Sequence, residues 1–190
     1  FSWNNLNQTE QSQFGESKIN LLSQRSAMSA AQADAAKNET LLAFIRGSRT
    51  AEDFQPGNVA KLFRKRSSRL GDIVNSQPQY IQGAIGSYSE NNYSAFKTQS
   101  ATRTAMVYAG ANDGMLHAFD AATGNEAWAI IPSLALPNLY KLADINYANS
   151  HAWFVDGAPV ISDIYDTTSS SWKTILVGGL NGGEIGRAHV

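Results

Sequence analysis

The sequence of 190 residues contains no cysteine, and charged residues make up only 16% of it. Without cysteine, the chain has no disulfide framework, no thiolate metal site and no cysteine nucleophile. No apolar run approaches the roughly 20 residues that a membrane-spanning helix needs. The formal net charge of −1 gives no overall attraction to nucleic acid or to anionic membranes. Uncharged polar residues and glycine fill the shortfall in charge, a composition more typical of exported bacterial proteins than of cytosolic enzymes.

Neither end of the sequence has the pattern of a natural chain end. Phe1 stands where an initiator methionine is expected, and no charged and apolar leader follows it, so we expect any export signal to lie upstream. At the other end, Leu176–Gly183 predicts a strand and a glycine-rich turn. The next seven residues, Glu184–Val190, match what a common sequencing adapter encodes. We interpret residues 184–190 as a non-native tail and assign no function to them.

Residues 1–60 differ in pattern from the rest of the chain. They are rich in Ala, Gln, Ser and Asn, and they predict a short helical and irregular lead-in. Asn38 is the expected N-cap of a helix over Glu39–Arg46, and Gly47 is its expected C-terminal stop.

Residues 61–183 predict a mainly β structure. Asp113 and Gly114 separate the first two of six short apolar runs and are typical of a tight hairpin. Because a propeller blade takes four strands in about 40–45 residues, this region holds about one and a half to two blades. A closed ring needs roughly 4–8 blades, so we expect an incomplete β-propeller. The expected strands are Met106–Ala109, Met115–Phe119, Ala127–Ile131, Ala152–Val155, Pro159–Ile164 and Trp172–Val177.

The stretch VYAGANDGMLHAFDAATGNEAW, Val107–Trp128, carries the clearest motif. Asp120 can accept backbone N–H groups at the start of a turn, and Gly124 gives that turn its backbone freedom. Trp128 offers a large flat surface, and we expect it to be buried against a strand of a neighbouring blade. The stretch resembles the propeller repeat shared by pyrroloquinoline-quinone (PQQ) dehydrogenases and their non-catalytic relatives. We interpret it as blade architecture rather than as a ligand site.

Further blocks around this repeat narrow the resemblance. Together and in this order they resemble the C-terminal propeller domain of the PilC/PilY family. The Asp156 and Gly157 pair belongs to the same set of structural propeller residues. The blocks are FIRGSR (Phe44–Arg49), LFRKRSSRLGDIVNSQPQYI (Leu62–Ile81), IPSLALPNL (Ile131–Leu139) and HAWFVDGAPVISDIYDTTSSSWKTILVGGL (His151–Leu180).

The resemblance implies a non-enzymatic role in type IV pilus assembly, retraction control and adhesion at the pilus tip. It implies minor pilins and host or abiotic surfaces as partners. It also implies an exported protein of the periplasm, the outer membrane surface or the pilus tip. The family has a calcium loop, but Asp156, Asp163 and Asp166 are too dispersed for the spacing of a Ca²⁺ loop. We therefore expect no cofactor in this part of the protein and Ca²⁺ in a downstream part.

Two alternatives remain beside the pilus hypothesis. The first is a PQQ-dependent dehydrogenase, which shares the repeat but commonly carries a vicinal cysteine pair that this chain lacks. The second is a periplasmic propeller scaffold for outer-membrane assembly, which gives no reason for the block at Leu62–Ile81. We predict that the protein is not an enzyme.

A run of basic residues and two histidines raise the question of a binding site. The run has one interleaved aromatic and no basic groove elsewhere, so we predict a solvated or locally paired segment and no nucleic-acid partner. Within it, we expect Arg64 or Arg66 to pair with Asp72. His117 and His151 have no partner at ligand spacing, and we interpret both as structural. The run consists of Lys61, Arg64, Lys65, Arg66 and Arg69.

Overall fold

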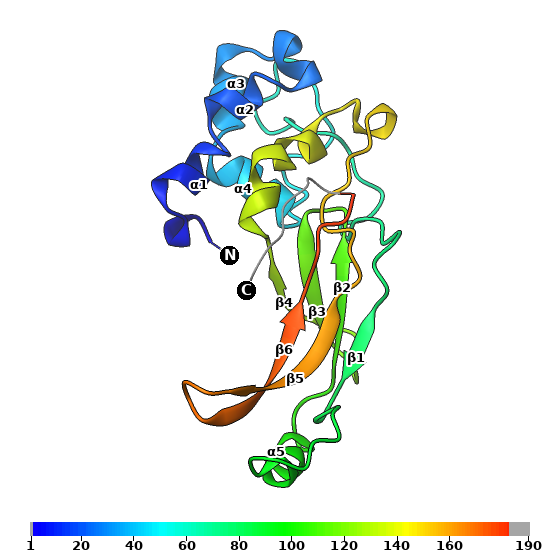
Figure 1. Ribbon diagram of the computed structural model, residues 1–190. Helices are drawn as coiled ribbons and strands as arrows, with labels where there is room; N and C mark the ends of the chain where they lie inside the picture. Colours follow the sequence, from blue (N-terminus) through cyan, green and yellow to red (C-terminus); the bar gives the residue numbers. More distant parts are fainter. Residues whose placement is uncertain (1, 183–190) are drawn as a thin grey trace.

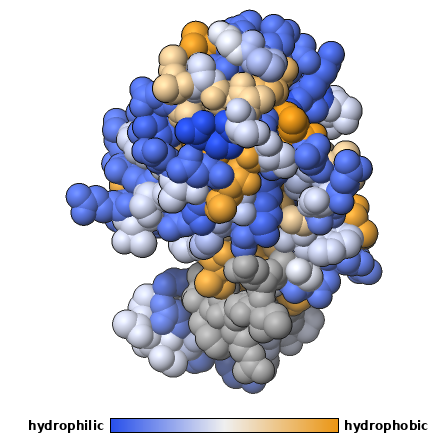
Figure 2. Space-filling view, turned by 90° about the horizontal axis from the view of Figure 1, so that it is seen from above, coloured by the Kyte–Doolittle hydropathy of each residue, from blue (hydrophilic) through white to orange (hydrophobic). Residues whose placement is uncertain are grey.

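The computed structural model describes residues 2–182 and has most of its helices at one end, with antiparallel strands below them in Figure 1. The expected non-native tail, residues 184–190, lies outside the described residues. None of the described helices is long and apolar enough to cross a membrane. The helical end presents mostly hydrophilic residues, with small hydrophobic patches between them (Figure 2). Its elements are η1 (Trp3–Asn5), α1 (Gln8–Ser12), α2 (Glu16–Ile19), η2 (Ser23–Ala27), α3 (Ala30–Ala35), α4 (Glu39–Ile45), η3 (Ser133–Ala143) and η4 (Tyr147–Asn149).

Two antiparallel sheets lie below the helical end in Figure 1. Residues 2–182 do not close into a ring of blades. The larger sheet is a four-stranded meander in chain order, the arrangement of one propeller blade. The smaller sheet is a hairpin that lies beside the larger one, with residues of both lining a shared cavity. The strands are β1 (Gln79–Ile81), β2 (Met106–Ala111), β3 (Met115–Asp120) and β4 (Glu126–Ile130), then β5 (Val160–Asp166) and β6 (Ser171–Val177).

Five of the six expected strands are present, but the expected strand at Ala152–Val155 is wrong. The backbone N–H of Phe154 donates to the side-chain oxygen of Asn112 at 3.0 Å, so side-chain contacts hold this segment in place of a strand ladder. The sequence also did not predict the short strand β1 or the helix α5 (Tyr93–Ser100).

Helix α5 lies in an insertion between β1 and β2 and is anchored by a buried carboxylate. Asp163 on β5 accepts from the Tyr93 hydroxyl at 2.6 Å, from the Ile85 amide at 2.7 Å and from the Thr174 hydroxyl at 2.7 Å. Burial raises the pKa of Asp163, but these hydrogen bonds outweigh it and hold the pKa below its ordinary value. Trp172 also packs edge-on against Tyr93, which completes the attachment of the insertion to the hairpin.

Helix α4 begins where the sequence predicts and ends one residue before the predicted end, but its start is built differently. Asn38 has φ 58° and its side chain makes no capping hydrogen bond; its backbone N–H donates to Phe14 at 2.7 Å instead. Gly47 ends the helix at φ 98°, where it donates to the Phe44 carbonyl. Ser48 then donates to the Ala43 carbonyl, which completes the two-bond stop that favours glycine at this position.

Trp128 is the second correction to the expected packing. It is 42% exposed, and its ring lies 5.6 Å from the ring of Tyr108 in the same sheet rather than on another blade. The cause is its place on β4, the edge strand of the sheet, beside which none of residues 2–182 forms a further strand. Val107 on β2 and Phe119 on β3 pair directly across the same sheet.

The hydrophobic core lies between the N-terminal helices and η3. Phe14, Phe44 and Phe63 are fully buried, and Leu139 of η3 joins them. The buried side chain of Gln24 connects the same parts, because its amide donates to the carbonyls of Leu62 and Ala143. One core thus includes residues from both sides of the expected boundary at residue 60, and that boundary stays a prediction.

Arg66 forms the buried ion pair of this core. Its Nε lies 2.7 Å from Glu52 Oε1, and its two Nη atoms donate to the carbonyls of Phe44 and Ser48 at 2.7 and 2.6 Å. The expected pairing with Asp72 is therefore wrong for Arg66. It is also wrong for Arg64, which donates to the Leu142 carbonyl instead.

Replacing Arg66 with methionine should destabilise the fold strongly. The change leaves the Glu52 carboxylate buried without a cation, and breaking a buried pair in this way costs about 3–5 kcal/mol. Urea unfolding followed by circular dichroism measures the loss. The exposed neighbour Lys65 provides the matched control, and Lys65→Met should change stability by less than about 0.5 kcal/mol. Equal effects of the two variants would contradict a central role for the Arg66 pair.

Candidate functional site

The hairpin turn between β2 and β3 is the centre of the candidate site. Ala111 pairs with Met115, so the loop has three residues, and only Gly114 has a positive φ, 95°. A Cβ on Gly114 would also collide with Leu139. The turn therefore needs glycine both for its backbone angle and for its contact with η3.

The two polar residues of this turn hold three distant segments together. Asn112 donates through its backbone and side chain to Asp72, at 3.0 and 2.9 Å, and its side-chain oxygen accepts from Phe154. Asp113 accepts from the Gly71 amide at 2.8 Å. Both Asn112 and Asp113 are buried, so the turn links residues 71–72 to residue 154 away from water.

Asp72 occupies the polar end of this junction. It accepts from Asn112 and lies 3.0 Å from His151 Nε2. Burial raises the pKa of Asp72, but the hydrogen bonds from Asn112 and His151 outweigh burial and hold the pKa below its ordinary value. The sequence suggested that His151 has no partner. The structure shows that it has one, because the fold brings Asp72 within hydrogen-bond distance.

His117 also has partners that the sequence did not reveal. Its Nδ1 lies 2.6 Å from Glu126 Oε1 on β4, and its Nε2 lies 3.1 Å from both carboxylate oxygens of Asp113. An ionised carboxylate only accepts hydrogen bonds, so both ring nitrogens must donate and the ring is an imidazolium. Burial lowers the pKa of His117, but the two carboxylates outweigh burial and raise the pKa above its ordinary value.

The turn between β3 and β4 is built around Asp120. Its Oδ1 accepts from the amides of Thr123 and Ala122 at 2.8 and 2.9 Å, and these bonds lower the pKa of Asp120. Gly124 follows with φ 73° and open space around it, so its role is the backbone angle alone. These two residues shape the turn that leads into the strand of Trp128.

Asp156 and Gly157 form a second junction. Asp156 accepts from the amide and the side chain of Asn75 at 3.1 and 2.6 Å. Gly157 donates to the Gly179 carbonyl at 3.1 Å, and a Cβ on Gly157 would collide with that carbonyl. Gly110 on β2 lies equally close to the backbone of residue 155, so three chain segments meet here through bare backbone.

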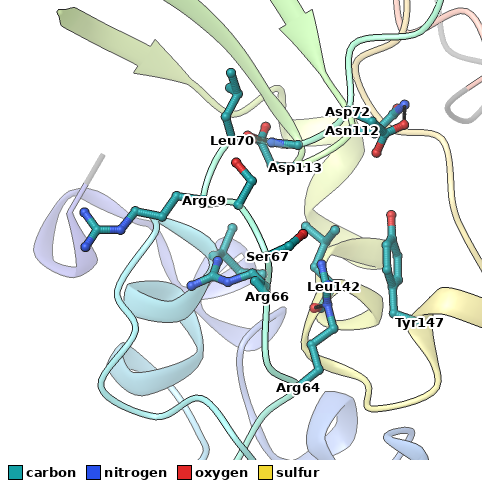
Figure 3. Close-up of a pocket in the computed structure, with 13 residues that line it drawn as sticks. Arg64, Arg66, Ser67, Arg69, Leu70, Asp72, Asn112, Asp113, Leu142 and Tyr147 are labelled. Atoms are coloured by element: carbon teal, nitrogen blue, oxygen red, sulfur yellow. Dashed lines mark hydrogen bonds between the residues drawn. The ribbon is translucent and has the colours of Figure 1, made fainter.

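A cavity of about 440 Å³ lies beside the first junction (Figure 3). Arg64 and Tyr147 line one part of it, and Asp72 and Asn112 lie at the other end. The Arg64 guanidinium sits 4.5 Å from the centre of the Tyr147 ring, and burial lowers the pKa of Arg64. Within residues 2–182, no three His, Asp or Glu side chains are grouped to hold a metal ion. The cavity is a polar junction whose acidic groups are held by neighbours in the chain.

The imidazolium of His117 should make stability depend on pH. Because the folded pKa is raised, its contribution is fully present below the unfolded pKa of about 6.5. It should be lost as the pH rises through the folded pKa. Urea unfolding between pH 5 and pH 10 should therefore show a decrease above about pH 6.5 that His117→Gln lacks. His151→Gln leaves the buried group intact and should keep the decrease; a wild-type slope in His117→Gln would contradict the imidazolium.

Comparisons with known proteins show which family this chain is similar to. The family model of the PilY1 beta-propeller domain matches residues 70–189. A type IV pilus biogenesis factor PilY1 homolog of Xylella fastidiosa is 46% identical over 150 residues, covering 75% of this chain and 12% of the relative. The type IV pilus biogenesis factor PilY1 of Pseudomonas aeruginosa strain PAK is 40% identical over 158 residues, covering 79% and 13%.

A solved structure is also similar, the crystal structure of the Pseudomonas aeruginosa PilY1 C-terminal domain. It is 33% identical and covers 55% of this chain and 20% of that chain, with a TM-score of 0.41. The chain spans only 12–13% of the length of the two curated relatives. The family model matches well over half of the chain, and it confirms the β-propeller class expected from the sequence. The chain belongs to the PilY1 family, within its β-propeller domain.

Proposed function

We propose that this protein takes part in type IV pilus biogenesis as a non-enzymatic binding protein, with roles in retraction control and surface attachment. The observation that carries the proposal is the match of residues 70–189 to the PilY1 propeller model. Two curated relatives are named as a pilus biogenesis factor and a homolog of one. The proposed partners are minor pilins and host or abiotic surfaces. The proposed location is outside the cytoplasm, in the periplasm, at the outer membrane surface or at the pilus tip.

The use of the motif carboxylates supports a non-enzymatic role. Asp113, Asp120 and Asp156 each accept hydrogen bonds from backbone amides, at Gly71, at Thr123 and at Asn75. A carboxylate engaged in this way stabilises turns and junctions rather than acting on a substrate. The PQQ-dehydrogenase and scaffold hypotheses gain no support from the family membership.

The cofactor part of the proposal concerns this chain alone. We expect residues 1–190 to bind neither Ca²⁺ nor PQQ tightly, with any Ca²⁺ site in a downstream part of the parent protein. Asp163 accepts a hydrogen bond from Thr174 on β6, and Asp166 accepts one from Ser169 in the turn between β5 and β6. Isothermal titration with CaCl₂ and with PQQ at neutral pH tests this. Saturable micromolar binding of PQQ would favour the enzyme hypothesis, and micromolar Ca²⁺ binding would place the calcium site in this chain.

A segment exchange tests the pilus function. Residues 70–182 replace the aligned segment of PilY1 in a Pseudomonas aeruginosa strain whose own PilY1 is deleted. The chimera should restore surface pili, because all the residues that form the two junctions lie within the exchanged segment. Shearing and immunoblotting of the pilin measure the surface pili. Asp113→Ala and Asp156→Ala together should abolish the restoration, since both junctions lose their acceptors.

The control for this exchange is Lys97→Ala, an exposed position on α5. It should restore pili as well as the unchanged chimera does. A chimera that accumulates to the normal level and still assembles no surface pili would contradict the proposed function.

A further inference from the structure

A second groove lies between the end of helix α4 and one face of the β3–β4 pair, beside the cavity of Figure 3. Its volume is about 490 Å³, within the size range of small-ligand and peptide-side-chain sites. Its floor is formed by the sheet, and its rim by the end of α4 and by the separate segment at residues 69–70. The lining includes Arg46, Gly47, Arg69, Met115, Phe119 and Glu126.

The rim carries two arginines without an acidic partner. Arg46 and Arg69 are exposed, and no Asp or Glu within residues 2–182 forms an ion pair with either of them. The nearby Arg49 and Arg66 differ, because both lie within ion-pair distance of Glu52. Two guanidinium groups at one groove are therefore free to bind an external anion.

The Arg69 side chain is positioned by its surroundings. Its Cδ lies 3.8 Å from the place that a Cβ on Gly47 would take, so its aliphatic stem crosses the end of α4. In Figure 3 it extends away from Asp72 and Tyr147, which line the first cavity. The end of α4 is itself fixed, because Arg66 donates to the Ser48 carbonyl. A positioned arginine loses less conformational freedom on binding than a mobile one.

The floor is partly apolar and partly charged. Met115 and Phe119 supply apolar surface, and Phe119 stacks on the ring of His117 at 5.7 Å. The imidazolium of His117 is flanked by the carboxylates of Asp113 and Glu126. His117 occupies both carboxylates, so Arg46 and Arg69 are left as the unpaired charges among the described residues that line the groove, which favours a ligand of moderate negative charge. The two carboxylates disfavour a continuous polyanion such as nucleic acid.

The neighbouring strand can receive an extended chain. β4 is the edge strand of its sheet, and Glu126 and Ala129 of β4 line the groove. An edge strand offers unpaired backbone groups to a peptide that adds as a further strand. Alternate side chains of such a peptide would then point toward one face, where the groove and its arginines lie.

We propose that this groove binds an extended acidic peptide segment of a partner protein. The peptide adds along β4, its carboxylates pair with Arg46 and Arg69, and an apolar side chain rests on Met115 and Phe119. The proposal goes beyond the pilus function and does not depend on it, since the binding is measured on the chain by itself.

The test uses the fluorescein-labelled hexapeptide Glu-Thr-Leu-Thr-Glu-Thr (the Leu–Glu probe), which places two Glu and one Leu on the same face of an extended strand. The hexapeptide with Gln in place of both Glu (the Leu–Gln probe) is its uncharged counterpart. Fluorescence anisotropy with residues 1–190 should show saturable binding of the Leu–Glu probe. The Leu–Gln probe should bind at least about tenfold more weakly, because it lacks the charges that pair with arginine. Arg46→Gln with Arg69→Gln should weaken the Leu–Glu probe by a similar factor.

Two further variants separate the groove from general charge effects. Arg46→Lys with Arg69→Lys keeps the charges and should keep most of the binding. Lys65→Gln with Lys97→Gln removes two exposed charges elsewhere and should leave binding unchanged. All four substituted positions are exposed, and equal thermal unfolding curves would show that the variants are folded.

Three results would overturn the proposal. The first is no saturable binding of the Leu–Glu probe. The second is an equal loss in the Lys65 and Lys97 control variant, which would indicate non-specific charge attraction. The third is tighter binding of a labelled single-stranded oligonucleotide than of the Leu–Glu probe, which would make the groove a nucleic-acid site instead.

Discussion

The bond between Asp113 and the Gly71 amide, together with those of Asn112 to Asp72, joins parts of the chain that lie far apart in sequence. Through one hairpin turn, the segment at residues 71–72 is fixed to the sheet, and the segment before β5 is fixed to the same turn. The turn is buried, so its hydrogen bonds are shielded from water and an unpaired partner would carry the full cost of desolvation. Arg69 and Leu70 line both the cavity and the groove, so the bond that anchors the next residue, Gly71, helps to shape both.

A second principle runs through the structure: buried carboxylates serve as fixed acceptors. Asp163 holds the α5 insertion, Asp156 holds the loop at Asn75, and Glu52 holds Arg66 against the end of α4. Several of the donors to these acids, among them the amides of Ile85 and Asn75, come from segments with little regular structure. Because long irregular connections cannot satisfy their own backbone groups, side-chain acceptors take over the role that a sheet ladder plays elsewhere.

The sequence predicts those features that depend on local pattern. Period-two runs and turn glycines located β2, β3 and β4, and Gly47 located the end of α4, since neighbouring residues determine these elements. β1 has three residues, too few for alternation to be visible. The segment at Ala152–Val155 is apolar like a strand, but its amide at residue 154 is taken by Asn112.

The contacts of the candidate site depend on tertiary structure, and the sequence could not reveal them. Glu126 reaches His117 only because β3 and β4 pair with an irregularity between residues 118 and 119. Arg66 pairs with Glu52 rather than with Asp72 because the chain folds back at an isolated β-bridge between Glu52 and Phe63. The exposure of Trp128 likewise depends on which strand stands next to β4, and no local pattern contains that information.

The meeting of Gly110, Gly157 and the carbonyl of Gly179 limits how this region can vary. Where two side chains touch, a larger residue on one side can be offset by a smaller one on the other. Here backbone faces backbone, so neither partner has any volume to give up. A single methyl group at Gly157 would force the segments apart, and no second substitution could restore their distance. A substitution of a glycine at the second junction therefore cannot be compensated by a substitution elsewhere. This constraint holds even though none of these glycines has a side chain with which to bind a ligand.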